Sequence, residues 1–303
     1  MRCDLHVHTI HSGMCTVPVF NKICRESYND PLDLYQILKR KGMDLVTVTD
    51  HDSIGAVEAL RKHPDFFLSE EVSCLTPSGT RIHVGVYDIN ERDHVELQRR
   101  RDDLLSLIFY LQERRLLFSV NHVFSRLTGR RTDADFVLFE HYFPLIETRN
   151  GQMPATGNRA AARLAEMWGK SPIAGSDAHS HCGLGSTHTT VAGARSKAEF
   201  IEGLRRGSGV VRGESGNYWK LTRSVIEVAT GLFREEPWAW ILGPLLLLVP
   251  VITLANCLAE AGFERRWSKR TGRASAANRG LGGELETGQV HPQFPGRVLN
   301  EYQ

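Results

Sequence analysis

The sequence lacks the cysteine pattern of a disulfide scaffold or of a Cys-x-x-Cys metal site. Its 303 residues include only six cysteines, and no two of them are spaced as a Cys-x-x-Cys pair. Cysteines this sparse indicate a reducing, cytosolic environment. The first residues also lack the basic and apolar regions of a signal peptide, which favours a cytoplasmic location for the amino-terminal part.

An excess of charge of one sign is also missing. Lys and Arg number 37 against 35 Asp and Glu, so the formal net charge is only +2. This balance excludes the strongly basic surface of a non-specific nucleic-acid coat, although a local basic patch remains compatible with it. Hydrophobic residues make up 41% and charged residues 24%, as in a globular chain with a sizeable core.

Short apolar runs alternate with helical stretches from residue 2 to about residue 206. Helical patterns cover about 31–41, 53–62, 95–115, 132–142, 158–168 and 197–206. The runs that predict strands are 2–6, 44–49, 66–73, 81–87, 116–121, 145–148, 172–175 and 189–191. Pro77-Ser78-Gly79 predicts a hairpin between the third and fourth of these strands. Strands that alternate with helices favour an α/β fold with a mostly parallel sheet or barrel.

One apolar run near the carboxyl terminus is unusually long. Residues 237–259 contain no charged side chain, and roughly 20 apolar residues are enough to span a bilayer. Trp238 and Trp240 lie at one end, where interfacial anchors are expected. A buried or interfacial segment is the alternative, because Pro244 and Pro250 interrupt a helix. We expect residues 238–259 to be a transmembrane or membrane-associated segment.

These features predict four regions. Residues 1–216 form the main domain, 217–237 a linker, 238–259 the membrane segment, and 260–303 a basic flank with a disordered tail. The basic flank would place the carboxyl-terminal side in the cytosol, whereas the missing signal peptide places the main domain there. We favour the second argument, since a large folded domain without a signal does not readily cross a membrane.

Histidines gather at the ends of the predicted strands. His6 and His8 are two residues apart at the end of the first strand, so the period of two points both to the same side. Similar polar clusters are Thr49-Asp50-His51-Asp52, Glu70-Glu71, His83, Asn121-His122 and Asp177-Ala178-His179. Strand ends of this kind are where α/β sheets and barrels bind ligands.

Each cluster alone has a structural interpretation. A single histidine such as His83 or His122 is more often a hydrogen-bonded core residue, Glu70-Glu71 fits a solvated pair, and Asp177 fits a helix N-cap. Taken together, clusters at successive strand ends favour a metal centre, because buried imidazoles and carboxylates need partners.

The ordered set of motifs resembles a known family. DLHVHT, TVTDHDS, EEVSC, RIHVGVY, NHVF and GSDAH follow one another as in the polymerase and histidinol phosphatase (PHP) family of metal-dependent phosphoesterases. The resemblance covers roughly residues 1–206. It implies a distorted seven-stranded β/α barrel with two or three divalent metal ions at its mouth.

The resemblance also implies a set of ligands. The positions that match the family's metal ligands are His6, His8, His51, Glu71, His83, His122, Asp177 and His179. Glu71 would bridge the first two ions, while His51 and His179 would belong to a third. Glu70 would then point away from Glu71, as alternation along a strand requires.

One family ligand is missing. Many members carry Asp or His five or six residues after the second histidine, where this chain has Gly13 and Met14. Either the third metal is weak or absent, or His11 or Cys15 replaces the missing ligand. A thiolate favours Zn²⁺, whereas histidines and carboxylates also suit Mn²⁺ or Fe.

We expect hydrolysis of a phosphate ester by a metal-activated hydroxide with in-line displacement. Asp177 would orient the water or accept its proton, and His179 would protonate the leaving oxygen if it is not committed to a metal ion. Phosphate also needs cationic partners, for which we predict Arg126, Arg130 and Arg149, with Arg131 close by. The expected substrate is a small phosphomonoester, a nucleotide or a nucleic-acid end.

Two alternatives remain open. Similar barrels and metals also support hydrolysis of a C–N bond, as in amidohydrolases. The gap at Gly13 instead favours a membrane-attached, non-catalytic metal-binding protein.

Overall fold

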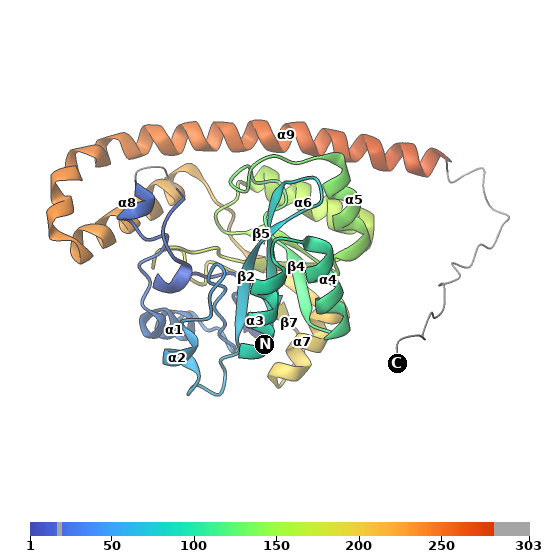
Figure 1. Ribbon diagram of the computed structural model, residues 1–303, viewed down its shortest axis with the longest axis horizontal. Coiled ribbons are helices and arrows are strands. Elements are labelled where there is room, and N and C mark those ends of the chain that lie inside the picture. The colour runs from blue at the N-terminus through green and yellow to red at the C-terminus, as the bar shows by residue number, and fades with distance from the viewer. Residues whose placement is uncertain (17–19, 282–303) are drawn as a thin grey trace, which may run out of the picture.

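A computed structural model describes residues 1–16 and 20–281 of the chain, with side chains in the last helix described up to Thr271 (Figure 1). The strands are β1 (Arg2–Cys3), β2 (Ser69–Leu75), β3 (Arg81–Tyr87), β4 (Leu117–Val120), β5 (Leu145–Asn150), β6 (Ser171–Gly175), β7 (Thr187–Val191) and β8 (Gly209–Gly213). They form a five-stranded sheet in the order β2-β3-β4-β5-β6 and a three-stranded sheet in the order β1-β7-β8. The predicted α/β class is confirmed.

The two edges of the larger sheet are linked through residues near the amino terminus. Residues 6–8 exchange backbone hydrogen bonds with the end of β6, where the Asp177 amide donates to the His6 carbonyl at 2.6 Å. On the other side the Thr49 amide donates to the Val7 carbonyl at 2.9 Å, and the Glu71 amide of β2 donates to Asp50 at 3.2 Å. Within the described residues these links are single bridges and not continuous strand pairs. The expected closed barrel is therefore not formed by continuous strand pairing, because the strands belong to two separate sheets.

β2 and β3 form the predicted hairpin. They pair antiparallel from Ser69 with Tyr87 to Leu75 with Arg81, and β4 is antiparallel to β3. β4, β5 and β6 are parallel to one another. The sheet is therefore mixed, and less parallel than the alternating pattern predicts.

Helices surround the sheets. They are α1 (Pro31–Arg40), α2 (Val57–Leu60), α3 (Glu91–Arg100), α4 (Leu104–Glu113), α5 (Asp133–Tyr142), α6 (Ala155–Trp168), α7 (Lys197–Arg205), α8 (Tyr218–Glu235) and α9 (Val249–Leu281), with 3-10 turns η1 (Ile10–Ser12), η2 (Phe20–Lys22) and η3 (Pro237–Leu248). α1 begins at the expected Asp30 cap, whose side chain accepts from the Leu32 and Asp33 amides.

The predicted helix over 95–115 is wrong as one element. The Asp103 side chain accepts from the amides of Leu105 and Ser106 and so caps a new helix, α4, after α3 ends at Arg100. The predicted helix over 53–62 is reduced to the four residues of α2.

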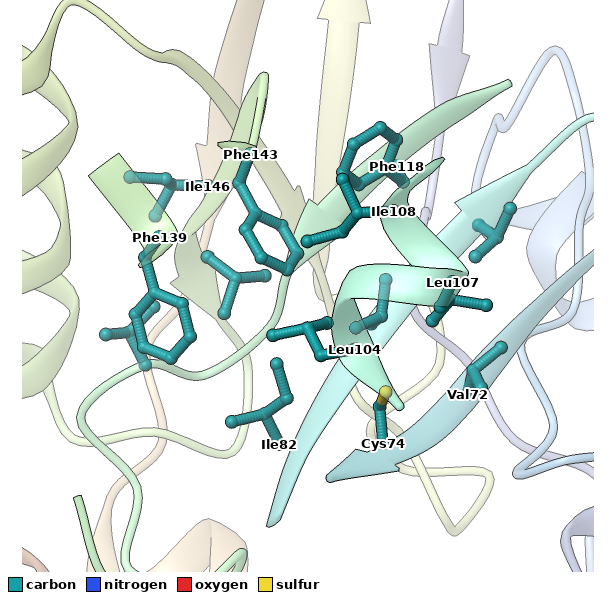
Figure 2. Close-up of a cluster of buried hydrophobic side chains, with 14 of the residues drawn as sticks. Val72, Cys74, Ile82, Leu104, Leu107, Ile108, Phe118, Phe139, Phe143 and Ile146 are labelled. Carbon is teal, nitrogen blue, oxygen red and sulfur yellow. The ribbon is translucent and has the colours of Figure 1, made fainter. Parts of the chain in front are cut away.

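The largest hydrophobic cluster lies between β2–β5 and the helices that cover them. Figure 2 shows Phe139 and Phe143 from the α5 region facing Phe118 of β4 and the leucines of α4. Burial of each such side chain stabilises the fold by about 1.5–3 kcal/mol. This packing fixes the strands whose ends carry the polar clusters.

The carboxyl-terminal region differs from the expected linker and tail. Residues 218–235, expected to be a linker, form helix α8, and residues 260–281 continue helix α9. α9 passes across one end of the molecule beside α6 (Figure 1). Trp267 is 5% exposed and stacks on Phe136 of α5 at 5.5 Å between ring centroids, so this part of α9 belongs to the main core. Residues 282–303 of the predicted tail lie outside the described residues.

The apolar run itself begins as η3 and continues as the first turns of α9. Within the described residues, Pro237–Thr271 is the one helical stretch long and apolar enough to cross a membrane, and only 11% of its most apolar window is buried. Ile241 and Leu247 are 79% and 81% exposed. The alternative of a buried segment is therefore not what the structure shows.

Candidate metal centre

The strand ends bring together all eight side chains that match the family's ligand positions. Glu71 of β2 lies at the middle of the group, with Oε2 3.2 Å from both His6 Nε2 and His51 Nδ1 and 3.5 Å from His83 Nδ1. Its other oxygen lies 3.3 Å from His122 Nε2. The clusters in which these atoms converge are His8–His51–His179, His6–His8–Asp177, His6–Glu71–His122 and His51–Glu71–His83.

Alternation along the strands selects which side chains face the centre. His6 and His8 flank the buried Val7 and are both almost fully buried. Glu70 points to the opposite face from Glu71, where it accepts a hydrogen bond from Gln98 at 2.9 Å and pairs with His94. The predicted divergence of the two glutamates is what the structure shows.

Many of the nitrogen and oxygen atoms at the centre form no hydrogen bond with one another. Among the described residues, His6 Nε2, His8 Nε2, His51 Nδ1, Glu71 Oε2, His83 Nδ1 and His179 Nε2 are buried without a hydrogen-bond partner. A buried polar atom left unpaired costs about 1–3 kcal/mol, so a group of them facing one point needs a common partner. Imidazole nitrogens and carboxylate oxygens fit a divalent cation in that place.

Hydrogen bonds behind the histidines fix which nitrogen faces the centre. His6 Nδ1 lies 2.7 Å from Glu147 Oε1, so it donates to this carboxylate and leaves Nε2 as the acceptor. Ser12 donates its only hydroxyl proton to Asp50 at 2.7 Å, and therefore accepts from His8 Nδ1 at 3.0 Å. In the neutral form of each ring, Nδ1 therefore carries the proton, and Nε2, which faces the centre, holds the lone pair that a metal ion would bind.

Amide side chains hold three carboxylates at the centre. Asn121 donates to Glu71 Oε1 at 2.7 Å, and Asn150 donates to Asp177 Oδ2 and Glu147 Oε2, each at 2.9 Å. The sequence motifs did not single out Glu147 or Asn150. Both residues lie at or just after the end of the predicted strand 145–148, and this position could have marked them as candidates. At this strand end only Arg149 was predicted to have a role.

Burial and neighbouring charges set the protonation of the centre. Burial, reinforced by His179, lowers the pKa of His8 to about 3, so this ring is neutral at physiological pH. Burial alone would raise the pKa of Glu71, but His6, His83 and His51 together hold it well below its usual range. Burial lowers the pKa of His6, but the Glu71, Asp177 and Glu147 carboxylates together raise it well above its usual value, so without a metal ion His6 and Glu71 form a charged pair. A metal ion binding here would take the place of the His6 proton.

Two residues of the centre have left-handed backbone. His122 has φ of 28° and Asp177 has φ of 52°, a region that costs a non-glycine residue about 1–2 kcal/mol. The His122 amide donates to Glu147 Oε2 at 2.9 Å, and the Asp177 amide donates to the His6 carbonyl. Hydrogen bonds with other residues of the centre therefore stabilise the strained backbone at His122 and Asp177.

The residues at the position of the missing family ligand offer no imidazole or carboxylate to a metal ion. Gly13 has no side chain, Met14 is 42% exposed, and Cys15 packs in an apolar cluster with Cys24 and Leu232. Among the described residues none of the potential metal-binding clusters contains His11 or Cys15. Neither of the two replacements that the sequence left open is brought to the centre.

A part of the chain matches a known family. Residues 155–208, which include Asp177 and His179, match the PHP-associated family model. The chain carries a PHP-associated segment. The predicted resemblance to the PHP family is thus confirmed.

An archaeal protein also matches the chain in sequence. The uncharacterised protein MJ1587 from Methanocaldococcus jannaschii is 35% identical over 68 residues, which are 22% of this chain and 38% of that protein. The chain therefore matches little more than a third of the length of this relative.

The chain is similar in structure to several solved proteins, and one of them shows a common fold. PsfC from Pseudomonas syringae is 18% identical, with a TM-score of 0.52 over 76% of this chain and 97% of that one, which shows a common fold. A Bifidobacterium adolescentis protein assigned as a metal-dependent phosphoesterase has a TM-score of 0.47 at 13% identity, over 67% and 96% of the chains. An amidohydrolase from Chromobacterium violaceum has a TM-score of 0.49 at 12% identity, over 70% and 97%.

The arginines predicted to bind substrate separate into two places in this PHP-like chain. Arg126 and Arg130 line a pocket of about 710 Å³ between the loop after His122 and α9, together with Arg131. Arg149 instead donates to the Gly213 carbonyl at 2.6 Å and is not among the residues that line this pocket.

Proposed function

We propose that the chain is a metal-dependent hydrolase that cleaves phosphate esters. The observation that carries this proposal is the group of buried, unpaired histidine and carboxylate atoms around Glu71. When bound, two or three divalent ions there would lower the pKa of a water molecule and neutralise charge on a phosphoryl group. Zn²⁺, Mn²⁺ and Fe²⁺ all suit this set of ligands.

The side chains of the protein supply orientation. Asp177 Oδ1 lies 3.3 Å from His8 Nε2, while Asn150 holds Oδ2 on the other side. The carboxylate is therefore fixed at the edge of the centre, 13% exposed, where it can orient an attacking water or accept its proton. His179 lies beside it, with Nδ1 3.7 Å from Asp177 Oδ1, and we propose that it would hold a metal ion at this edge of the centre.

The basic pocket beside the loop after His122 supports a phosphate ester over a C–N substrate; its lining residues do not include any of the eight candidate ligands. Arg266 of α9 faces the same space as the three arginines of the 126–131 loop, and Phe263 and Trp267 complete its wall. Guanidinium groups bind phosphate oxygens through paired hydrogen bonds. The two aromatic rings pack in the main core, so the arginines are the groups that a ligand would meet. A nucleotide, an oligonucleotide end and a small phosphomonoester all carry a phosphate that fits them.

Hydrolysis by the full chain tests the proposal. The chain is loaded with Mn²⁺, Zn²⁺ or Fe²⁺ and assayed with an aryl phosphate, its diester analogue, a nucleotide panel and an N-acyl amino acid. We expect chelator-sensitive cleavage of phosphate esters that Asp177→Ala reduces at least 1000-fold. Arg130→Ala should raise KM for nucleotides about 10-fold, whereas Arg206→Ala, an exposed arginine outside the pocket, should leave it unchanged.

The outcomes separate the candidate functions. Cleavage of only the amide substrate would replace the phosphoesterase by a C–N hydrolase. Metal binding without turnover of any substrate would favour the non-catalytic alternative. Full activity in a folded Asp177→Ala chain would contradict the site.

We also propose that η3 and the first turns of α9 attach the cytoplasmic catalytic domain to a membrane. The supporting observation is the exposed apolar surface of this segment, with Trp238 and Trp240 more than half exposed. The full chain should float with phosphatidylcholine and phosphatidylglycerol vesicles. Ile241→Asp with Leu247→Asp should abolish flotation, whereas Phe109→Asp on α4 should not; equal flotation of all three would contradict the proposal.

A further inference from the structure

We propose that Glu26 is the carboxylate ligand of a third metal ion, which it binds together with His51 and His179. The proposal rests on the metal centre described above and extends it to a residue outside the family's ligand positions. Glu26 lies outside the four clusters whose ligand atoms already converge, so its case is made by its own distances to His51 and His179. Glu26 comes from the segment between η2 and α1, thirteen residues after the position that Gly13 leaves without a donor.

The distances fit a shared ion better than a hydrogen bond. Glu26 Oε2 lies 3.6 Å from His51 Nε2, and Oε1 lies 3.7 Å from His179 Nε2. A neutral imidazole has one nitrogen with a lone pair, so His51 would bind this ion through Nε2 and direct its Nδ1 proton toward Glu71 Oε2, 3.2 Å away. Hydrogen bonds between such groups are about 2.7–3.2 Å long. Two ligands of one tetrahedral zinc ion, each about 2.1 Å from the metal, are about 3.4 Å apart. The His6–Glu147 pair at 2.7 Å shows what a direct bond looks like in the same centre.

The hydrogen bond of His179 fixes its metal-binding nitrogen. His179 Nδ1 lies 3.0 Å from the Asp177 carbonyl, which can only accept, so Nδ1 carries the proton. Nε2 then holds a lone pair, is buried without a partner among the described residues, and faces Glu26. His8 stacks on both His51 and His179, at 4.6 and 4.2 Å between ring centroids, and keeps the two rings on one side of the centre.

Neighbouring contacts hold Glu26 at this place. Its amide donates to the Gly13 carbonyl at 3.0 Å, so the residue lies against the gap in the motif. Arg25 forms a two-pronged pair with Glu235 of α8, at 2.6–3.0 Å, and Ser27 donates to the His8 carbonyl at 3.0 Å. Because both flanking residues are anchored, the Glu26 carboxylate has a fixed direction, and the Arg25 cation is engaged elsewhere.

Metal stoichiometry tests the proposal. The metal-free full chain is titrated with Zn²⁺ and, separately, Mn²⁺ by calorimetry, and the dialysed protein is measured by elemental analysis. We expect three equivalents in the wild type and two in Glu26→Gln, or a third site weakened at least 10-fold. Glu58→Gln, at a glutamate 78% exposed and away from the centre, should keep three, and so should Cys15→Ser. The metal-free variants should melt within about 2 °C of the wild type, which shows that Glu26→Gln is folded.

Failure of Glu26 and failure of the whole centre give different results. Three equivalents in Glu26→Gln, or only two in the wild type, would overturn the role of Glu26 and leave the other ligands standing. No bound metal in the wild type would overturn the centre and with it the proposed hydrolase. A loss of one equivalent in Cys15→Ser would return the third site to the thiolate.

Discussion

Glu147 is not one of the candidate ligands, but it holds two of them in place. Glu147 accepts from His6 Nδ1 and from the His122 amide, and so fixes a ring from the first strand and the strained backbone after β4. It lies 141 positions from His6 in the chain. A contact between residues this far apart leaves no mark on local spacing, which is why the sequence did not reveal it.

Glu147→Gln should weaken metal binding. The amide cannot accept from both groups as the carboxylate does, so His6 loses the partner that orients it and raises its basicity. We expect a 10- to 100-fold lower affinity for Zn²⁺, measured by competition with a chromogenic chelator. Glu202→Gln, at an exposed glutamate of α7, is the control and should bind like the wild type. Equal affinity in both variants would mean that Glu147 has no such role.

Gly175→Ala should disturb the same histidine from the other side. A Cβ on Gly175 would lie 2.2 Å from His6 Cβ and 2.4 Å from the His6 amide nitrogen, so backbone must move. We expect a loss of about 1–3 kcal/mol in the free energy of unfolding, together with weaker metal binding. Gly262→Ala in α9, where a Cβ meets nothing within 4 Å, should be neutral or stabilising in the same urea titration. Equal stability of both variants would contradict the close packing at β6.

At the level of single residues, the sequence motifs located the candidate ligands well. Each follows an apolar strand, and strand ends meet in space, so a local pattern was enough to place His6, His8 and Asp177 together. Their role as ligands stays a prediction. Glu26 escaped notice because its segment is irregular, and no period or motif marks the direction of its side chain.

Among the elements, the β2–β3 turn and α5 are joined through one carboxylate. Asp135 accepts from Ser78 Oγ at 2.6 Å, from Thr76 Oγ1 at 2.9 Å and, as part of the capping box of α5, from the Thr132 amide at 2.6 Å. Burial raises its pKa, but these donors together hold the pKa below its usual value. The hairpin turn is thereby tied to the helix that packs over the core.

Asp135→Asn should reduce stability in a pH-dependent way. The folded pKa of Asp135 is below the unfolded one, so its contribution is present above the unfolded value of about 4 and is lost as the pH falls through the folded value. We expect the variant to be about 1–2 kcal/mol less stable at pH 7, with the difference shrinking below about pH 4. Urea unfolding at both pH values measures it. Asp102→Asn, at an exposed position, should show no such gap, and a gap independent of pH would contradict the account.

Element boundaries were less predictable than element types. The α/β pattern and the β2–β3 hairpin followed from apolar runs and turn residues. The break between α3 and α4 did not, because Asp103 within a charged run looks like one more solvated residue until its cap is seen. The helix α8 was expected to be a linker, although Leu221, Val225, Val228 and Leu232 recur at helical spacing along it. Leu232 and Phe233 at its end are buried.

For the whole molecule, residues 260–267 of α9 pack on the main domain. Glu260 accepts from the Arg126 amide at 3.0 Å, and Trp267 packs on Phe136, so the helix touches the loop that follows His122 and the main core. The apolar segment, η3 and the first turns of α9, is therefore followed in the same helix by residues that pack on the main domain. No sequence pattern could show this, because Trp267 alone in a basic flank resembles an interfacial anchor.

Trp267→Ala should destabilise the whole domain. Removing a buried tryptophan leaves a cavity against Phe136 and should cost about 3–5 kcal/mol. Denaturant unfolding of the full chain measures it by far-ultraviolet circular dichroism. Trp219→Ala, at a side chain that is 76% exposed, is the control and should change stability by less than about 0.5 kcal/mol. If both tryptophans prove equally dispensable, α9 does not belong to the core.

The central claim is that the buried histidines and carboxylates around Glu71 form a metal centre. Anomalous diffraction from crystals of the full chain grown with Zn²⁺ or Mn²⁺ tests it most directly. We predict at least two anomalous peaks within about 2–2.5 Å of the Glu71 oxygens and the surrounding histidine nitrogens. Histidines that instead close direct hydrogen bonds to Glu71 and Asp177, with no anomalous peak among them, would contradict the account.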